Sequence, residues 1–170
     1  MSDVPVSSPM PMKPTLRFML SHPAHLISLG FGSGLAPFAP GTFGTLLGWL
    51  GTRWLQPMLG DEVFFIGLAF ALIVGTWAVG VTGRALGESD HGSIVWDEVI
   101  AMAIITALLP GAMWKQAWAF LLFRLLDIRK PGPIGWADRN VKGAFGVMLD
   151  DLIAAAMTLF IVALWVRVFG

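Results

Sequence analysis

The stretch EVFFIGLAFALIVGTWAVG, residues 62–80, decides the fold class of this chain. A second stretch, MLDDLIAAAMTLFIVALWVRV at residues 148–168, has the same apolar character. Both approach the roughly 20 residues that an α-helix needs to cross a bilayer. Two shorter apolar stretches, residues 94–109 and 114–128, carry ionisable groups at one end, and residues 42–59 form a less apolar fifth segment. The sequence therefore predicts an all-α, polytopic membrane protein with a compact bundle of about four to five helices.

The composition supports the same class. Of 170 residues, 56% are hydrophobic and only 13% charged, and the mean hydropathy is +0.74, which is too apolar for an ordinary soluble domain. The 11 basic and 11 acidic residues balance, so the chain lacks the positive field that draws in nucleic acid. The absence of cysteine excludes disulfides, thiolate zinc sites and cysteine nucleophiles.

The N-terminal part of the chain differs from the rest. Residues 1–14 are rich in Ser and Pro, without an apolar run after a basic start, which predicts a disordered tail rather than a signal peptide. Residues 15–170 are expected to form a single membrane-embedded domain. Within it, residues 16–31 are interrupted at His22 and Pro23, so we expect an interfacial or re-entrant helix there.

Threading the helices alternately through a membrane sorts the loops into two groups. The turns at residues 60–61 and 110–113 are short, whereas loops 30–41, 81–93 and 129–147 on the other side hold most ionisable residues. The positive-inside rule places that second side in the cytoplasm, and we expect the chemistry to occur there. Its basic residues are Arg84, Arg124, Arg129, Lys130, Arg139 and Lys142.

Carboxylates from three helices are expected to meet at one membrane-proximal level on this side. Grouping buried carboxylates is costly unless a cation compensates their repulsion. Oxygen ligands without cysteine and with little histidine favour Mg²⁺ or Mn²⁺ over Zn²⁺. The five carboxylates are Asp97, Glu98, Asp127, Asp150 and Asp151, with Asp138 available from the loop.

The same side carries groups suited to an anion. Arg129, Lys130 and Arg139 can bind a phosphate, and an arginine can do so with two parallel hydrogen bonds. The Gly32-Ser33-Gly34 stretch and the Pro40-Gly41-Thr42 stretch add backbone amides just before a predicted helix N-terminus. Together these groups indicate phosphoryl chemistry at the membrane interface.

Simpler interpretations stand beside these. Asp150 and Asp151 open a predicted helix, where capping alone explains one of them but not the pair. Asp127 follows Arg124 by three residues, so the two can form a structural ion pair. His91 can carry a proton near neutral pH, although a single loop histidine is more often only hydrogen-bonded.

Several separated motifs, in order over residues 21–155, resemble the bacterial phosphatidylglycerophosphatase A family. The family resemblance implies a Mg²⁺-dependent phosphatase of the cytoplasmic (inner) membrane that hydrolyses phosphatidylglycerophosphate to phosphatidylglycerol and inorganic phosphate. The motifs are LGFGSGLAP (29–37), PGTFGT (40–45), DHGSIVWDE (90–98), FRLLD (123–127), KP (130–131), DR (138–139) and LDD (149–151).

The resemblance also implies roles for individual residues. Asp97, Glu98, Asp127 and Asp150 are the expected catalytic residues, and these four together with Asp151 are the expected Mg²⁺ ligands. Either Asp97 or Asp150 is expected to act as the base. The resemblance puts Arg124 and Arg139 beside the phosphate, and the basic and backbone-amide groups described above add Lys130, Gly41 and Thr42 to the expected substrate-binding residues.

Two other functions were compared with the phosphatase. A small transport or ion-handling membrane protein would need polar residues through the membrane depth, whereas here they gather at one side. A CDP-alcohol phosphotransferase shares the magnesium and lipid-phosphate chemistry, but its signature motif is missing. Homo-oligomerisation is compatible with so short a bundle, and the sequence offers no specific sign of it.

Overall fold

The computed structural model describes residues 13–169, with side chains to residue 168. Every regular element in that part of the chain is a helix and none is a strand, which confirms the all-α prediction. The tail predicted for residues 1–14 lies, up to residue 12, outside the described residues. The elements are α1 (Leu16–Leu20), α2 (Pro23–Ser28), the 3-10 helix η1 (Gly30–Leu35), α3 (Pro40–Leu59), α4 (Asp61–Leu86), α5 (Trp96–Leu108), α6 (Met113–Arg129), α7 (Pro133–Asn140) and α8 (Gly143–Phe169).

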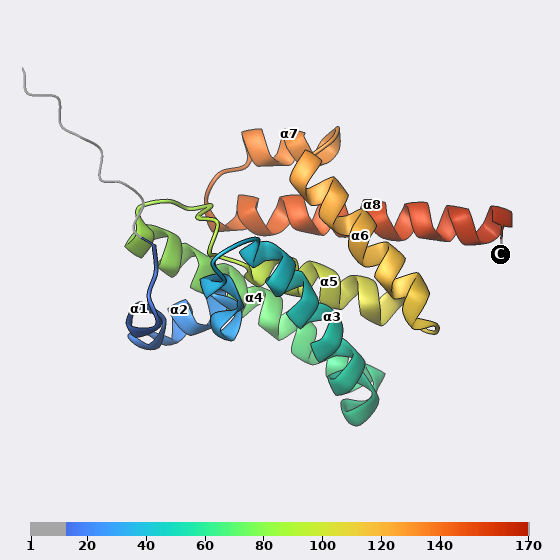
Figure 1. Cartoon of the computed structure of the whole chain (residues 1–170), viewed down its shortest axis with the longest axis horizontal. Helices are drawn as coiled ribbons and strands as arrows, with labels where there is room; N and C mark the ends of the chain where they lie inside the picture. The colour runs from blue at the N-terminus through green and yellow to red at the C-terminus, as the bar shows by residue number, and fades with distance from the viewer. Residues whose placement is uncertain (1–12, 170) are drawn as a thin grey trace, which may run out of the picture.

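Helix α5 lies at the centre of the bundle, in contact with α3, α4, α6 and α8 (Figure 1). Ten of its 13 residues are buried, because the sequence WDEVIAMAIITAL is apolar on nearly every face after its first turn. A helix that is hydrophobic all round is stable only where neighbours surround it. The carboxylates at the start of α5 are therefore carried into the interior of the protein.

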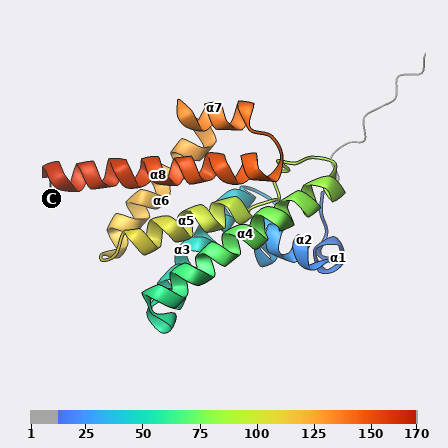
Figure 2. The ribbon, with the colours of Figure 1, turned by 180° about the vertical axis from the view of Figure 1, so that it is seen from behind.

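Two helices, α4 and α8, are long and apolar enough to cross a membrane. With 26 and 27 residues they extend for about 40 Å, more than the roughly 30 Å of a hydrocarbon core. Helices α5 and α6, with 13 and 17 residues, extend for only about 20 and 26 Å. Seen from behind, α4 crosses α5 and α3 while α8 runs along the other side of α5 (Figure 2).

The connections divide between two ends of the molecule. In Figure 1 the α3–α4 and α5–α6 turns and the C-terminus lie toward the right. Helices α1 and α2, the loop before α5 and the start of α8 lie toward the left. Helix α7 occupies part of the segment that was expected to be a long loop, and it packs on α8.

The single N-terminal helix expected over residues 16–31 is divided into α1, α2 and η1. The division occurs at His22, whose backbone is extended and whose Nδ1 accepts a hydrogen bond from the Ala24 N–H at 3.1 Å. Pro23 then opens α2, a position where its missing N–H costs nothing. Positive φ angles at Gly30, Phe31 and Gly32 prevent α2 from continuing further.

Close packing of α3 on α5 depends on glycine. A Cβ at Gly44 would lie 2.8 Å from the Val95 side chain, and one at Gly48 would collide with the Val99 backbone. Because neither position has a side chain, the two backbones approach closely, as small residues allow in membrane helices. The first turns of α3 and α5 are thereby held side by side.

We predict that Gly75→Ala destabilises the protein and that Gly67→Ala on the same helix does not. A Cβ at Gly75 would collide with the indole of Trp96, whose Nε1 donates to the Ala71 carbonyl at 3.1 Å. Overpacking of this kind costs about 1–3 kcal/mol. A Cβ at Gly67 meets open space, so alanine there is neutral or stabilises by up to about 1 kcal/mol. Thermal unfolding in detergent measures both, and equal effects would contradict the packing described.

Candidate active site

Three carboxylates form a buried cluster where α5 and α8 meet. Asp97 and Glu98 come from the first turn of α5, and Asp151 comes from α8, two turns after that helix begins. One oxygen of each lies within 4.8 Å of the corresponding oxygens of the other two. The side chains are close because α5 and α8 pack against each other at the polar end of the bundle.

One carboxylate oxygen of each residue in this cluster lacks a hydrogen-bond donor. Asp97 Oδ1, Glu98 Oε2 and Asp151 Oδ2 are buried and have no partner within the described residues. Burying unpaired carboxylates costs several kcal/mol, so such a group is stable only when a cation or protons neutralise it. Three convergent carboxylate oxygens are the ligands that a hard divalent cation such as Mg²⁺ prefers. The residues present therefore fit a divalent metal.

Arg124 of α6 lies beside the cluster. Its Nη1 is 2.6 Å from Asp127 Oδ2 and 3.4 Å from Glu98 Oε1, and it also donates to Thr45 Oγ1 at 3.5 Å. The ion pair expected between Arg124 and Asp127 is thus present, but it extends to a carboxylate on α5. The Arg124 Nε is buried without a partner, so one N–H of the guanidinium has no acceptor among the described residues.

The start of α3 completes this side of the site. Gly41 is buried, and a Cβ there would collide with Glu98 Oε1 and lie 3.0 Å from Arg124 Nη2. Glycine is therefore required for Glu98 and Arg124 to pair against the helix. Four residues later, the Thr45 hydroxyl donates to the Gly41 carbonyl at 2.8 Å while accepting from Arg124. The N-terminus of α3 adds its partial positive charge at the same place.

A second charged group lies next to the cluster. Lys130 Nζ is 2.5 Å from Asp138 Oδ1 on α7 and 2.6 Å from Asp150 Oδ2 on α8. Burial acts to lower the pKa of Lys130, but the two carboxylates outweigh it and raise that pKa above its ordinary value. Lys130 therefore stays protonated. Asp150 Oδ1 also accepts from the Asp151 N–H at 3.2 Å, so both oxygens of Asp150 have partners.

The other residues expected in the site lie as follows. Asp127 adjoins the cluster through Arg124 and interacts electrostatically with Glu98 and Asp151. Arg139 is exposed on α7 and, in residues 13–169, forms no hydrogen bond or ion pair. The Thr42 hydroxyl likewise has no hydrogen-bond partner in that range, and Thr42 is half-buried.

The capping interpretation of Asp150 and Asp151 is wrong, because α8 begins at Gly143 and both residues lie within the helix. His91, which was considered as a proton carrier, is buried, and its Nδ1 accepts from the Ser93 N–H at 3.2 Å. It therefore has a local structural role in the loop before α5.

Two contributors were not identified from the sequence. Thr45 was quoted only as the end of a motif, although its spacing of four from Gly41 puts both on one face of α3. The sequence places Asp138 in a motif and in the loop near the carboxylates, but nothing in it shows that the segment before α8 folds into α7 and returns to Lys130.

We predict that Mg²⁺ stabilises the protein through the carboxylate cluster. An ion that binds only the folded state adds about 2.7 kcal/mol at 100 times its Kd. Asp151→Asn should lose this gain, and without metal it should unfold at a higher temperature than the unchanged protein, because one buried charge is gone. Thermal unfolding in Mg²⁺ and in EDTA tests both. The exposed Glu88→Gln is the control, and a full Mg²⁺ shift in Asp151→Asn would refute the assignment.

A further prediction concerns Lys130 and Asp150. Lys130→Met leaves the Asp150 side chain, only 6% exposed, without its cation, and should lower the free energy of unfolding by about 3 kcal/mol. Adding Asp150→Asn to the same chain should restore most of this loss, because the uncompensated charge is then absent. A double-mutant cycle measured by denaturant unfolding gives the interaction energy, and strict additivity would disprove the pairing.

Comparison with known proteins places the chain in one family. Residues 26–166 match the family model described as Phosphatidylglycerophosphatase A. The chain is 41% identical over 143 residues to phosphatidylglycerophosphatase A of Escherichia coli (strain K12), covering 84% of this chain and 83% of that protein. It is 40% identical over 150 residues to the Haemophilus influenzae protein of the same name, covering 88% and 92%. No solved structure matches the chain. The resemblance seen in the motifs is confirmed: the chain belongs to the phosphatidylglycerophosphatase A family of enzymes.

Proposed function

We propose that this protein hydrolyses the terminal phosphomonoester of phosphatidylglycerophosphate, giving phosphatidylglycerol and inorganic phosphate. The substrate is the one in the name of its relatives. The observation that carries the proposal is the pairing of two features at one end of the bundle. Three carboxylates have buried oxygens without partners, and an arginine beside them has a buried N–H without an acceptor. Cation and phosphate sites side by side are what phosphate hydrolysis requires.

Asp97, Glu98 and Asp151 are the proposed ligands of a Mg²⁺ ion. Asp127 lies next to them, and Asp150 lies beside the cluster in its ion pair with Lys130. When bound, the ion supplies positive charge close to the phosphate oxygens and the attacking water. The donor set supports this assignment, because all three residues offer hard carboxylate oxygen and none offers nitrogen or sulfur.

Arg124 binds the phosphate in this proposal, through the Nε that has no partner in the protein. Its contacts with Glu98 and Asp127 hold the guanidinium in place, so little side-chain entropy is lost when the anion arrives. Arg139 adds positive charge from α7. Lys130, which follows α6, is also proposed to lie near the phosphate, with its charge balanced by Asp138 and Asp150. Gly41 leaves room for the Glu98–Arg124 pair, and Thr42 presents its hydroxyl at the start of α3.

Hydrolysis then needs one base. Water attacks phosphorus, the bond from phosphorus to the glycerol oxygen breaks, and the proton released by water returns to that oxygen through a carboxylate. Of the two candidates, Asp97 is favoured over Asp150. Both oxygens of Asp150 already accept hydrogen bonds, whereas Asp97 gives the ion one oxygen and keeps the other for the proton.

The proposed setting is the bacterial inner membrane, with the site on the cytoplasmic side and residues 15–170 forming one embedded domain that crosses several times. The support is the two helices long enough to span, together with the basic residues gathered around the site. The acyl chains stay in the bilayer while the headgroup reaches the carboxylates. Homo-oligomerisation remains an expectation that no described contact addresses.

A small transport or ion-handling protein is the alternative. Such a protein needs polar groups along a path through the membrane, but here the charged clusters lie at one end of the bundle. Beyond Asp151, α8 continues for most of its length with apolar residues. The phosphatase is therefore the better-supported function.

We predict that the purified protein releases phosphate from phosphatidylglycerophosphate in Mg²⁺ but not in EDTA. Asp97→Asn and Asp127→Asn should lower kcat by roughly 10²–10⁴-fold, the range that a positioned acid or base contributes. The measurement is phosphate release in detergent micelles, with thermal unfolding to show that each variant is folded.

The matched control is Glu88→Gln, which removes an exposed carboxylate near the same end of the bundle and should keep the full rate. A folded Asp97→Asn variant with a near-normal rate would refute its assignment. A folded, unmodified protein that releases no phosphate would favour the transport alternative.

A further inference from the structure

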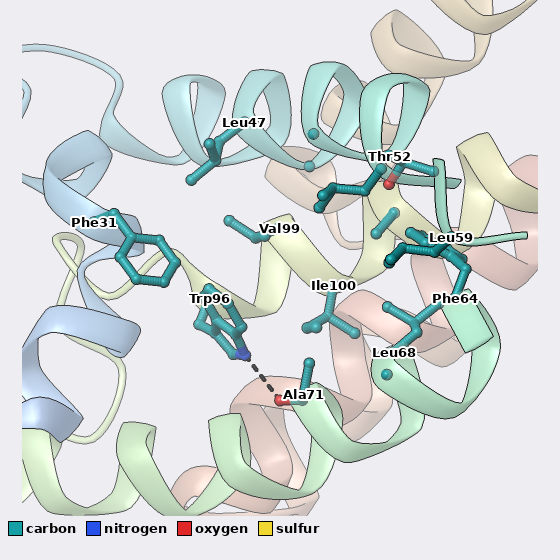
Figure 3. Close-up of a pocket in the computed structure, with 15 residues that line it drawn as sticks. Phe31, Leu47, Thr52, Leu59, Phe64, Leu68, Ala71, Trp96, Val99 and Ile100 are labelled. Carbon is teal, nitrogen blue, oxygen red and sulfur yellow. Dashed lines mark hydrogen bonds between the residues drawn. The ribbon is translucent and has the colours of Figure 1, made fainter. Parts of the chain in front are cut away.

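An apolar groove of about 290 Å³ lies between α3, α4 and α5 (Figure 3). Apart from glycine, its lining consists of aliphatic and aromatic side chains with Thr52 the single hydroxyl. The indole N–H of Trp96 is already occupied by the Ala71 carbonyl. Apart from the Thr52 hydroxyl, the groove therefore offers no free side-chain donor to a polar ligand, and it suits a hydrocarbon.

The groove is elongated along the helices. Figure 3 shows Phe31 and Trp96 near one end and Leu59 and Phe64 near the other. On α3 the lining runs from Leu47 to Leu59, which is about 18 Å of helix. One leaflet of a bilayer has a hydrocarbon thickness of roughly 15 Å, half of the core. The groove thus matches a single extended acyl chain that follows the helices through one leaflet.

One end of the groove is level with the candidate active site. Trp96 lines the groove, and the next two residues of α5, Asp97 and Glu98, belong to the carboxylate cluster on another face of the same turn. The end of the groove and the carboxylate cluster therefore lie on two faces of the same turn of α5, about one helix diameter apart. The diameter of a helix with its side chains is about 10 Å.

The headgroup of the substrate is long enough to bridge this separation. Roughly eight single bonds join the diacylglycerol carbon to the terminal phosphorus of phosphatidylglycerophosphate, and an extended chain of that length covers about 10 Å. A lipid with a chain in the groove can thus reach the cluster with its terminal phosphate. A lipid phosphate attached directly to diacylglycerol has a shorter reach.

We propose that the groove between α3, α4 and α5 binds one acyl chain of the lipid substrate and sets its preference for long-chain lipids. The inference rests on the proposed function, since it names the substrate that the groove serves. The groove stays open where Gly51 and Gly67 form part of its wall. A Cβ at Gly51 of α3 or at Gly67 of α4 meets no atom within 4 Å, so larger side chains there enter the groove without disturbing the helices.

The test uses substitutions that fill the groove with a larger side chain. Gly67→Leu and Gly51→Leu are compared with the unchanged protein and with Ala69→Leu, a matched control that adds the same side chain to an exposed position of α4 outside the groove. Each protein is assayed with dioleoyl and with water-soluble dibutanoyl phosphatidylglycerophosphate. Light scattering in detergent gives the oligomeric state, and thermal unfolding shows that each variant is folded.

We expect the unchanged protein to have a higher kcat/KM for the long-chain lipid. Gly67→Leu should lower that value at least tenfold while leaving the short-chain value within twofold, and Gly51→Leu should do the same. Ala69→Leu should match the unchanged protein on both lipids. If either glycine variant fails to fold, the other carries the comparison.

Several results would overturn the proposal. They are an equal loss on both lipids, no loss on either, and a change of oligomeric state with the chain-length preference intact, which would make the groove a contact between copies. An unchanged protein that hydrolyses both lipids equally would remove the groove's role and leave the proposed function standing. Hydrolysis of neither lipid would overturn the function and the groove together.

Discussion

Repulsion among buried carboxylates is the constraint on which the rest of this structure depends. Asp97, Glu98 and Asp151 converge in the interior, and Arg124 pairs with only one of them. Like charges a few ångströms apart repel strongly where water is excluded, so the cluster lowers the stability of the metal-free protein. The packing around α5 offsets this cost. A divalent cation removes it, which links the stability of the fold to the ion that the site is suited to hold.

Glycine on α3 is what lets one helix serve both the cluster and the groove. Gly44 and Gly48 bring the α3 backbone onto α5, and Gly41 leaves space for the Glu98–Arg124 pair at the first turn. On another face of α3, Gly51 leaves the apolar groove open. A bulkier residue at Gly44 or Gly48 would separate α3 from α5, and one at Gly41 would displace the Glu98–Arg124 ion pair. The small residues therefore determine where the polar headgroup and the hydrocarbon can lie relative to each other.

The sequence predicted the helical class, the long segments now seen as α4 and α8, and the family, because long apolar runs and ordered motifs are local properties. It predicted less well what depends on distant contacts. The division of the N-terminal helix at His22 was marked by Pro23, but the start of α8 at Gly143 was not, since the glycines Gly143 and Gly146 before Asp150 are typical of a loop. The bond from Lys130 to Asp138 depends on α7 folding back, and no periodicity in eight residues reveals that.

Charge balance within the site suggests the order in which its ligands enter. If all four carboxylates, Asp97, Glu98, Asp127 and Asp151, are ionised around the one arginine, the site carries an excess of three negative charges. The neighbouring Lys130 is shared between two further carboxylates, so it contributes no surplus positive charge. A phosphate dianion approaching this site is repelled until a cation is bound. Even one divalent ion leaves the cluster negative, so the unpaired Arg124 N–H, the α3 N-terminus and exposed cations such as Arg139 must supply the remaining attraction.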